Sequence, residues 1–429
     1  MSIGHNILTH KLQALLDNRR HQGRLLYHPL PTTLMGTVDF GSNDTLGLSS
    51  SGLLSAAFLR ELERHPTFTV GSTSSRAVEG GRQYLLDLED DLAKFHGAAT
   101  GLFVHSGYSA NVAIWSTLPQ PGDFVVYDEL VHASIHDGLR QCRATSRAFR
   151  HNDCAALKRQ LEEIRDQDEG VAHGRQVVFI AIESFYSMDG DMAPLHSIIT
   201  AAREALPAGN YLCVIDEAHS NGLVGPNGSG YVCHYGLEEE FPIRLHTCGK
   251  ALASMGAIIL CSKTVKEALI NYARNIVFST APSYLSAAGV RAGYELVASV
   301  EGEKQLRQVL QQKVRYFYHR LTNDPTWQRA RRKDILSLPT ETTWSSRPLQ
   351  SPVIALITRV DRANALAEHL QQHQYWVNAI HFPAVPRGQD RVRLMIHASN
   401  SLAEIETVVA LIMEWTTRQL ETNIMRAEL

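Results

Sequence analysis

The chain has 429 residues, of which 44% are hydrophobic and 20% are charged, and its formal net charge is −3 at pH 7. This length exceeds what one small hydrophobic core supports, so we expect two domains. The charge favours neither nucleic acid nor an anionic membrane as a partner, and no apolar run approaches the ~20 residues of a membrane span. The six cysteines form no Cys-x-x-Cys pair, which favours reduced thiols and a cytoplasmic protein.

The first part of the chain predicts an arm followed by a large α/β domain. Leucines in the segment 7–16 lie on one helical face, and we take residues 1–50 as an N-terminal arm. From 51 to 290, helical segments alternate with short apolar runs. Such runs are typical of a mostly parallel sheet that is covered on both faces. They span residues 101–104, 124–127, 177–182, 213–215 and 257–260.

Residues 291–429 predict a smaller α+β domain. A long helical stretch, 285–319, leads into it, and strands are expected at 353–357 and 391–396. The segment 323–351 is polar and contains three prolines, so we expect a loop or an insertion there. The last helix begins with a capping box from Ser401 to Glu404.

Polar clusters follow several of the predicted strands, where ligands bind in open α/β sheets. Ser106, Gly107 and Tyr108 open a helix, as an anion site would, although an ordinary strand-to-helix turn fits too. His132 and His136 are four residues apart, a spacing that can hold a metal, but the glutamate of an HExxH motif is missing. A ring that stacks on a planar cofactor is the better functional interpretation of His132, and a buried core histidine is the structural one.

Three further clusters leave alternatives open. Ser187 begins the turn 187–191, which either presents Ser187 to a ligand or is a solvated turn. Its Asp-Gly-Asp lacks the ligand ladder of a calcium loop, so we expect no metal site. Ser279 and Thr280 either cap the next helix or bind phosphate. Arg391 and Arg393 share one face of a strand, which is either a solvated charged face or a fork for a substrate carboxylate.

The most informative pattern is a lysine after one strand and an Asp-x-x-His at the end of an earlier one. The residues are Lys250, Asp216 and His219. A lysine amine forms a Schiff base with pyridoxal phosphate, and a carboxylate that keeps the pyridine nitrogen protonated makes the ring an electron sink. The histidine can hydrogen-bond the phenolate oxygen of the same ring.

In order along nearly the whole chain, eight segments resemble the α-oxoamine synthase family of fold-type I pyridoxal-phosphate enzymes, and most closely its fungal 8-amino-7-oxononanoate synthase-like members. The resemblance implies a large domain with a mostly parallel seven-stranded sheet and a smaller C-terminal α+β domain. The segments are 40–48, 106–111, 132–135, 187–191, 216–219, 247–250, 278–281 and 379–393.

The resemblance also implies roles for single residues. Lys250 carries pyridoxal 5'-phosphate and moves the α-proton, and Asp216 pairs with the pyridine nitrogen. His132 stacks on the ring, while His219 and Ser187 contact its phenolate oxygen. The residues implied to hold the phosphate are Ser106, Gly107, Tyr108 and Thr247. Ser279 and Thr280 are implied to reach the phosphate of the neighbouring subunit, in a homodimer with a shared active site. Asn43 and Arg393 are implied to bind the amino-acid substrate.

The implied reaction is a decarboxylative Claisen condensation of alanine, glycine or serine with an acyl-CoA or carrier-bound acyl thioester, which yields an α-amino ketone. Three departures from the family lie where the acyl donor is usually recognised. Thr45 lies where the family usually has a tyrosine, and His381 lies where it has an arginine. Where the pimeloyl-using members have an N-terminal basic cluster, this chain has only Arg24 nearby. A pimeloyl chain needs a cation at its far end. We therefore expect a longer or neutral, polyketide-type acyl donor from fungal secondary metabolism.

Two other functions compete with this interpretation. An aminotransferase or lyase would use the same Asp216, His219 and Lys250 without consuming a thioester, but the turn 187–191 and the run 385–388 favour condensation. A non-catalytic partner subunit would be expected to lose Lys250, which is present.

Overall fold

The computed structural model describes residues 3–22, 25, 35–359 and 362–427, with side chains described as far as Glu421. Its larger sheet has seven strands in the order β2-β8-β7-β6-β5-β3-β4. Only β8 runs antiparallel to its neighbours, which confirms the expected mostly parallel sheet. The strands are β2 (Thr100–Val104), β3 (Phe124–Asp128), β4 (Thr145–Phe149), β5 (Val178–Glu183), β6 (Tyr211–Asp216), β7 (Ile243–Thr247) and β8 (Ala257–Cys261).

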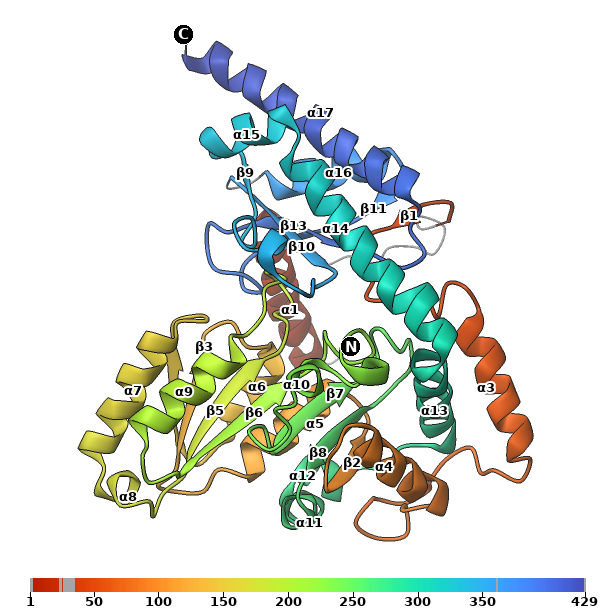
Figure 1. Ribbon diagram of the computed structural model, residues 1–429, viewed down its shortest axis with the longest axis vertical. Helices are drawn as coiled ribbons and strands as arrows, with labels where there is room; N and C mark the ends of the chain where they lie inside the picture. Colours follow the sequence, from red (N-terminus) through yellow and green to blue (C-terminus); the bar gives the residue numbers. More distant parts are fainter. Residues whose placement is uncertain (1–2, 23–24, 26–34, 360–361, 428–429) are drawn as a thin grey trace.

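Helices cover both faces of this sheet, as the continuous apolar strands require (Figure 1). Alternate residues of one strand enter different cores: Ile180 and Ile182 join one cluster, while Phe179 and Ala181 join the other. One face carries α4 (Gln83–Phe95), α7 (Cys154–Gln167) and α9 (Leu195–Ala205), and the other carries α5 (Gly107–Thr117), α6 (Ala133–Leu139), α11 (Lys263–Tyr272) and α12 (Arg274–Val277). The shorter helices of this part are α8 (Glu169–Ala172), η1 (Pro226–Gly228) and α10 (Tyr231–Tyr235).

A second, antiparallel sheet belongs to the C-terminal part, which lies above the large sheet in Figure 1. Its order is β12-β13-β10-β9, and the separate strand pair β1-β11 ties residues near the N-terminus to the same region. The strands are β1 (Val38–Asp39), β9 (Leu336–Ser337), β10 (Val353–Thr358), β11 (Tyr375–Trp376), β12 (Asn378–Ile380) and β13 (Arg391–Met395). The helices are α13 (Tyr284–Ala298), η2 (Gly302–Arg307), α14 (Gln308–Thr322), α15 (Pro325–Arg332), η3 (Trp344–Ser346), α16 (Ala363–Gln372) and α17 (Leu402–Ala427).

The structure corrects two expectations for this region. The stretch 285–319 is not one helix, because Ser299 leaves the helical conformation and its hydroxyl bonds both the carbonyl of Leu296 and the amide of Gly302. The segment 323–351 is not only a loop, since it contains α15. Asp324 caps that helix and Pro325 occupies its first turn, where a proline starts a helix rather than breaking it.

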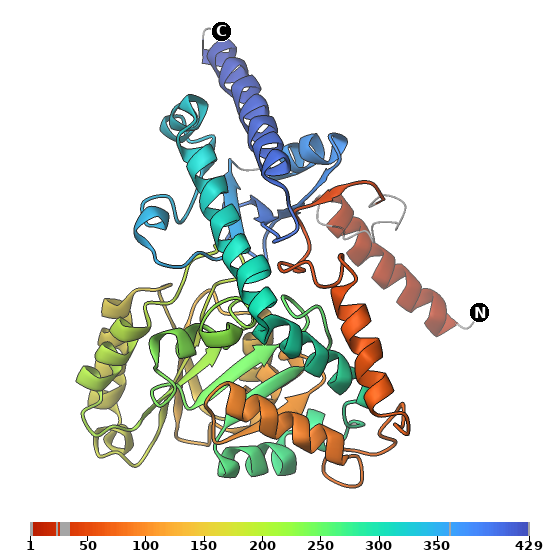
Figure 2. The same ribbon diagram turned by 45° about the vertical axis from the view of Figure 1, so that its right-hand side comes forward.

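The N-terminal arm begins with helix α1 (Ile3–His21), which stands away from the sheets in Figure 2. A second helix, α3 (Leu53–Arg64), follows the arm. The apolar side chains of α1 are 45% to 64% exposed; they are Ile7, Leu8, Leu12, Leu15 and Leu16. Among the described helices, none combines the length and the apolar character of a membrane span. The bounds of the three predicted regions stay a prediction.

The turn 187–191 is where the large sheet meets the small one. Gly190 has a positive φ of 70°, and a Cβ there would collide with the carbonyl oxygen of Val353 in β10. Only glycine satisfies both constraints.

We predict that Gly190→Ala lowers the free energy of unfolding by about 3 kcal/mol or more, because it adds a collision to the backbone strain. Gly209→Ala is the matched control: its φ is 75°, but no atom lies within 4 Å of an added Cβ, so about 1 kcal/mol is expected. Urea unfolding of both variants measures the difference. Equal losses would contradict the close approach of the two sheets.

Candidate active site

Lys250 lies in the tight loop between β7 and β8, and its amine approaches a histidine. Its Nζ is 2.8 Å from Nε2 of His219, which follows the end of β6. Burial lowers the pKa of Lys250 to about 8, although the charges of Asp216 and Glu183 oppose this effect. Burial and the Lys250 charge also lower the pKa of His219 well below its usual range. At neutral pH His219 is therefore uncharged, and part of the Lys250 population is a free amine.

Two carboxylates end adjacent parallel strands beside this amine. Asp216 is 7% exposed and accepts hydrogen bonds from Asn111 Nδ2 (2.8 Å) and from the amide of Ala218 (2.9 Å). Glu183 lies in register with it on β5. Burial and the charge of Asp216 raise the pKa of Glu183 well above its usual range. Glu183 and Asn111 were not predicted as site residues; for Glu183 the available signal was its place at a strand end, which it shares with Asp216.

His132 caps the N-terminus of α6 beside these carboxylates. Its amide donates to Oε1 of Glu183 at 2.5 Å, and its Nδ1 is 2.7 Å from the hydroxyl of Ser134. Burial lowers the pKa of His132, and the charges of Asp216 and Lys250 act on it in opposite directions. The structure thus gathers the neutral ring of His132 with the predicted lysine and aspartate.

The predicted phosphate site lies at the N-terminus of α5. The Ser106 hydroxyl accepts from the amide of Ser109, while Gly107 approaches Thr247 so closely that an added Cβ would lie 3.1 Å from the threonine Cβ. The Tyr108 side chain is half exposed and its hydroxyl bonds Asp137. First-turn amides have no partner within the helix and suit an anion.

The predicted substrate residues also come together. Arg393 on β13 donates from Nε to the carbonyl of Ser187 (2.7 Å) and from Nη2 to Oδ1 of Asn43 (3.1 Å). Neither bond uses Nη1. Burial lowers the pKa of Arg393 to about 10, so the guanidinium stays charged at neutral pH. Arg391 does not share this role, since it is fully buried and pairs with Asp189.

Ser279 and Thr280 bond other described residues than Lys250 in this single chain. Ser279 Oγ donates to the carbonyl of Asn275 at 2.7 Å, and Thr280 pairs through its backbone with Ser75. Both line a small recess together with Ser109. Their predicted reach into a neighbouring subunit stays a prediction.

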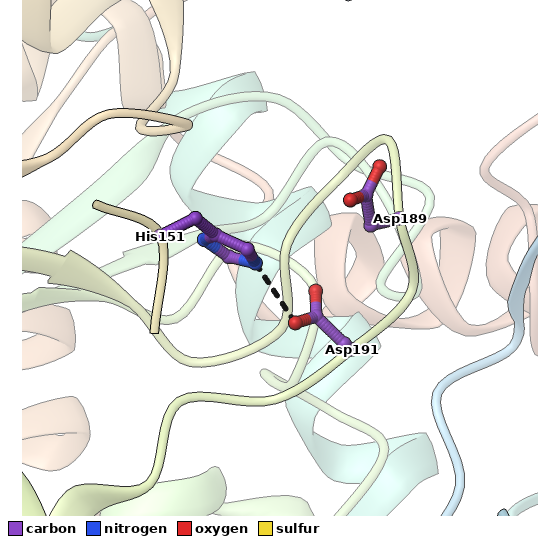
Figure 3. A group of neighbouring side chains, drawn as sticks. All are labelled: His151, Asp189 and Asp191. Carbon is purple, nitrogen blue, oxygen red and sulfur yellow. Dashed lines mark hydrogen bonds and ion pairs between the residues drawn. The ribbon is translucent and has the colours of Figure 1, made fainter. Parts of the chain in front are cut away.

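Within the described part of the chain, His151, Asp189 and Asp191 have the spacing of a metal site (Figure 3). Both ring nitrogens of His151 already bond carboxylates, with Asp128 at 2.8 Å and Asp191 at 2.8 Å. Although burial opposes it, these bonds raise the pKa of His151 to about 10. With Arg391 on Asp189, the group is an ion-pair network in which a cation would meet two positive side chains.

The described residues fit pyridoxal phosphate. The amine of Lys250 is deprotonated enough to react near neutral pH, the Asp216 carboxylate is anchored for a ring nitrogen, and the glycine at the start of α5 leaves room that a side chain would fill.

Comparison with known proteins agrees with this chemistry. Residues 36–412 match the family "Aminotransferase class I and II". The chain belongs to that family. It is 39% identical over 412 residues to aminoacyl transferase sphA of Aspergillus fumigatus (96% of this chain, 87% of that protein), and 41% identical over 403 residues to 8-amino-7-oxononanoate synthase of Emericella nidulans (93% and 94%).

Solved structures place it more finely. Serine palmitoyltransferase of S. paucimobilis, with a bound PLP–myriocin aldimine, superposes with a TM-score of 0.75 at 25% identity, over 90% of this chain and 88% of that one. The chain is therefore an α-oxoamine synthase, a pyridoxal-phosphate-dependent acyltransferase, as the sequence resemblance indicated.

We predict that attachment of pyridoxal phosphate to the cofactor-free α-oxoamine synthase rises with pH around a midpoint near 8, because only the neutral Lys250 amine reacts. Asp216→Asn removes a charge that raises this pKa, so its midpoint moves to lower pH. Stopped-flow absorbance at saturating cofactor measures the rates, with Lys250→Ala as the blank. A midpoint near 10.5, the ordinary lysine value, would contradict the desolvation of this amine.

For the ion-pair network we predict that neither dialysis against EDTA nor added Ca²⁺ or Mg²⁺ changes the thermal midpoint of the protein. His151→Gln is expected to lower it, because two carboxylates lose their cationic partner. Differential scanning fluorimetry measures both. A rise of several degrees with one cation would show that the cluster holds a metal.

Proposed function

We propose that the enzyme condenses a small amino acid, alanine, glycine or serine, with an acyl thioester whose far end is uncharged, and releases the free thiol, carbon dioxide and an α-amino ketone. One observation supports the choice of acyl donor. A cavity of about 370 Å³ adjoins His132 and Ser187, and apolar side chains make most of its wall. They come from residues 130–131, 188 and 382–386.

Among the described residues that line this cavity, the ionisable ones other than histidine and tyrosine are the acidic Glu129 and Asp189. Arg387 lies 4.4 Å from the centroid of the Phe382 ring but is exposed and does not line the cavity. A terminal carboxylate would lose water there without gaining a cation. An apolar chain end has no charge to desolvate, and it gains contact with the apolar wall of the cavity.

The departures from the family pattern agree with this proposal. His381 lies where the family has an arginine; its ring bonds Asp390 (3.0 Å) and Asn364 (2.9 Å) and does not line the cavity. Thr45 is buried, and its hydroxyl has no hydrogen-bond partner among the described residues. Arg24 lies outside the described residues.

When bound, pyridoxal phosphate supplies an electron sink for the charge left at the α-carbon. Asp216, held by Asn111, is the fixed negative charge of this site. Lys250, with a pKa near 8, can take and return the α-proton at Nζ, and His219 at 2.8 Å orients that amine. Nη1 of Arg393, which bonds none of the described residues, is placed to bind the carboxylate of the amino acid, while Asn43 and Ser187 fix the guanidinium.

We further propose a homodimer in which Ser279 and Thr280 contact the phosphate of the partner. Large apolar side chains around this segment are exposed in the single chain, and an interface would cover them; Val70 is 63%, Val78 66% and Phe278 72% exposed. The proposed donor is of the polyketide type and belongs to fungal secondary metabolism. The likeness to 8-amino-7-oxononanoate synthase supports the competing carboxylate-ended donor.

The test compares octanoyl-CoA, palmitoyl-CoA and pimeloyl-CoA with each of the three amino acids, by thiol release and product mass. We expect kcat/KM for a neutral chain to exceed that for pimeloyl-CoA at least about tenfold, since the uncompensated carboxylate costs over about 1.4 kcal/mol. Turnover of pimeloyl-CoA at ~1 per second or more would sink the proposal. A keto acid formed without thiol release would favour an aminotransferase.

A positively charged side chain placed in the cavity wall should reverse the preference for a neutral acyl chain over pimeloyl-CoA. We expect Met188→Arg to raise the rate with pimeloyl-CoA relative to octanoyl-CoA, because Met188 lines the cavity. Met255→Arg, at a residue that is 64% exposed, is the control and should leave the ratio unchanged.

A further inference from the structure

A buried polar chain that the proposed mechanism does not use lies next to the end of β7, from which the loop of Lys250 starts. Its centre is Tyr294 on α13, which is 6% exposed. The tyrosine hydroxyl lies 2.9 Å from Nε2 of His96 and donates to Oδ1 of Asn221 at 3.1 Å. Both partners are buried, His96 completely.

The asparagine connects this chain to the site. Nδ2 of Asn221 donates to the carbonyl of Thr247 at 3.0 Å, and its own amide donates to the carbonyl of Glu217 at 2.9 Å. Asn221 therefore ties the turn that carries His219 to the end of β7, from which the loop of Lys250 starts. The relative position of these two segments sets the 2.8 Å distance between His219 and Lys250.

The histidine fixes the other side of the tyrosine. Nδ1 of His96 lies 2.9 Å from the carbonyl of Ser229, which can only accept, so this nitrogen carries the proton. Burial lowers the pKa of His96 well below its usual range, which leaves the ring neutral and its Nε2 an acceptor. The single proton of the Tyr294 hydroxyl thus faces two buried acceptors, Oδ1 of Asn221 and Nε2 of His96, and removing the hydroxyl leaves both without this donor.

We propose that Tyr294 is a positioning residue of the cofactor site, acting through Asn221 on the turn of His219 and on Thr247. Without the Tyr294 hydroxyl, the turn samples arrangements in which His219 and Thr247 do not face the cofactor. The apparent affinity for pyridoxal phosphate then falls in proportion to the fraction of molecules that are in the binding arrangement. The tyrosine ring keeps its packing in a phenylalanine variant, edge-on to Phe95 at 5.1 Å, so the substitution opens no cavity.

The test uses cofactor-free protein and pyridoxal phosphate alone. We expect Tyr294→Phe to weaken the Kd of pyridoxal phosphate about tenfold, measured by absorbance titration, as expected for one lost buried hydrogen bond. Hydrogen exchange of the amides in residues 217–223 should quicken in the same variant. Tyr318→Phe is the matched control, because Tyr318 is equally buried and its hydroxyl bonds Thr340 at 2.9 Å in the small domain; its Kd should equal that of the wild type.

A double-mutant cycle separates positioning from general destabilisation. We expect Asn221→Ala to weaken the Kd to a similar extent, and Tyr294→Phe to add no further loss in that background. A wild-type Kd in Tyr294→Phe, an equal loss in Tyr318→Phe, or additive losses in the cycle would each overturn the proposal. If Tyr294→Phe does not fold, Asn221→Ala alone decides, and a wild-type Kd in that variant overturns it.

Discussion

A lysine amine kept from water beside two carboxylates is the constraint on which this structure depends. Such an amine stays reactive only if its charge is disfavoured by burial and its neighbours are held still. The parallel sheet meets both needs, because parallel strands end at the same edge: Asp216 and Glu183 lie in register on β6 and β5, and the loop of Lys250 leaves β7 next to them. The high pKa of Glu183 follows from the same crowding, since two buried carboxylates at adjacent strand ends do not ionise independently.

The small sheet completes the site through arginines. Arg391 and Arg393 lie on the same face of β13, and both reach the turn 187–191, one through Asp189 and the other through the Ser187 carbonyl. The first contact is an internal ion pair that fixes the turn. The second holds a charged guanidinium beside Asn43, with its pKa lowered to about 10 because it is buried. Two similar residues on one face of the strand thus have different partners, because they lie at different positions along it.

The sequence predicts what depends on local pattern and fails where tertiary contacts decide. Apolar runs predict five strands of the large sheet, but edge strand β4 contains no apolar run, since most of its residues are exposed, and it was not predicted. Asp324 and Pro325 are residue types that are common in loops. In this order, however, they form the N-cap and the first position of helix α15. Lys250, Asp216 and His219 share strand ends and spacing, so their meeting could be foreseen. Asn221 and Tyr294 share no pattern, because 73 positions separate residues that only folding brings together.

In the proposed function, substrate choice depends on other residues than the chemistry does. Lys250, Asp216 and Glu183 lie at or after the ends of β7, β6 and β5, whereas much of the cavity wall comes from residues 382–386. A side chain changed in that wall would then alter which chain end the wall accepts without moving the lysine or the aspartate. The ring of His381 bonds Asp390 and Asn364 and does not line the cavity, so this position places no side chain in the wall. Under the proposal, one scaffold keeps its condensation chemistry while the residues of one wall select the acyl donor.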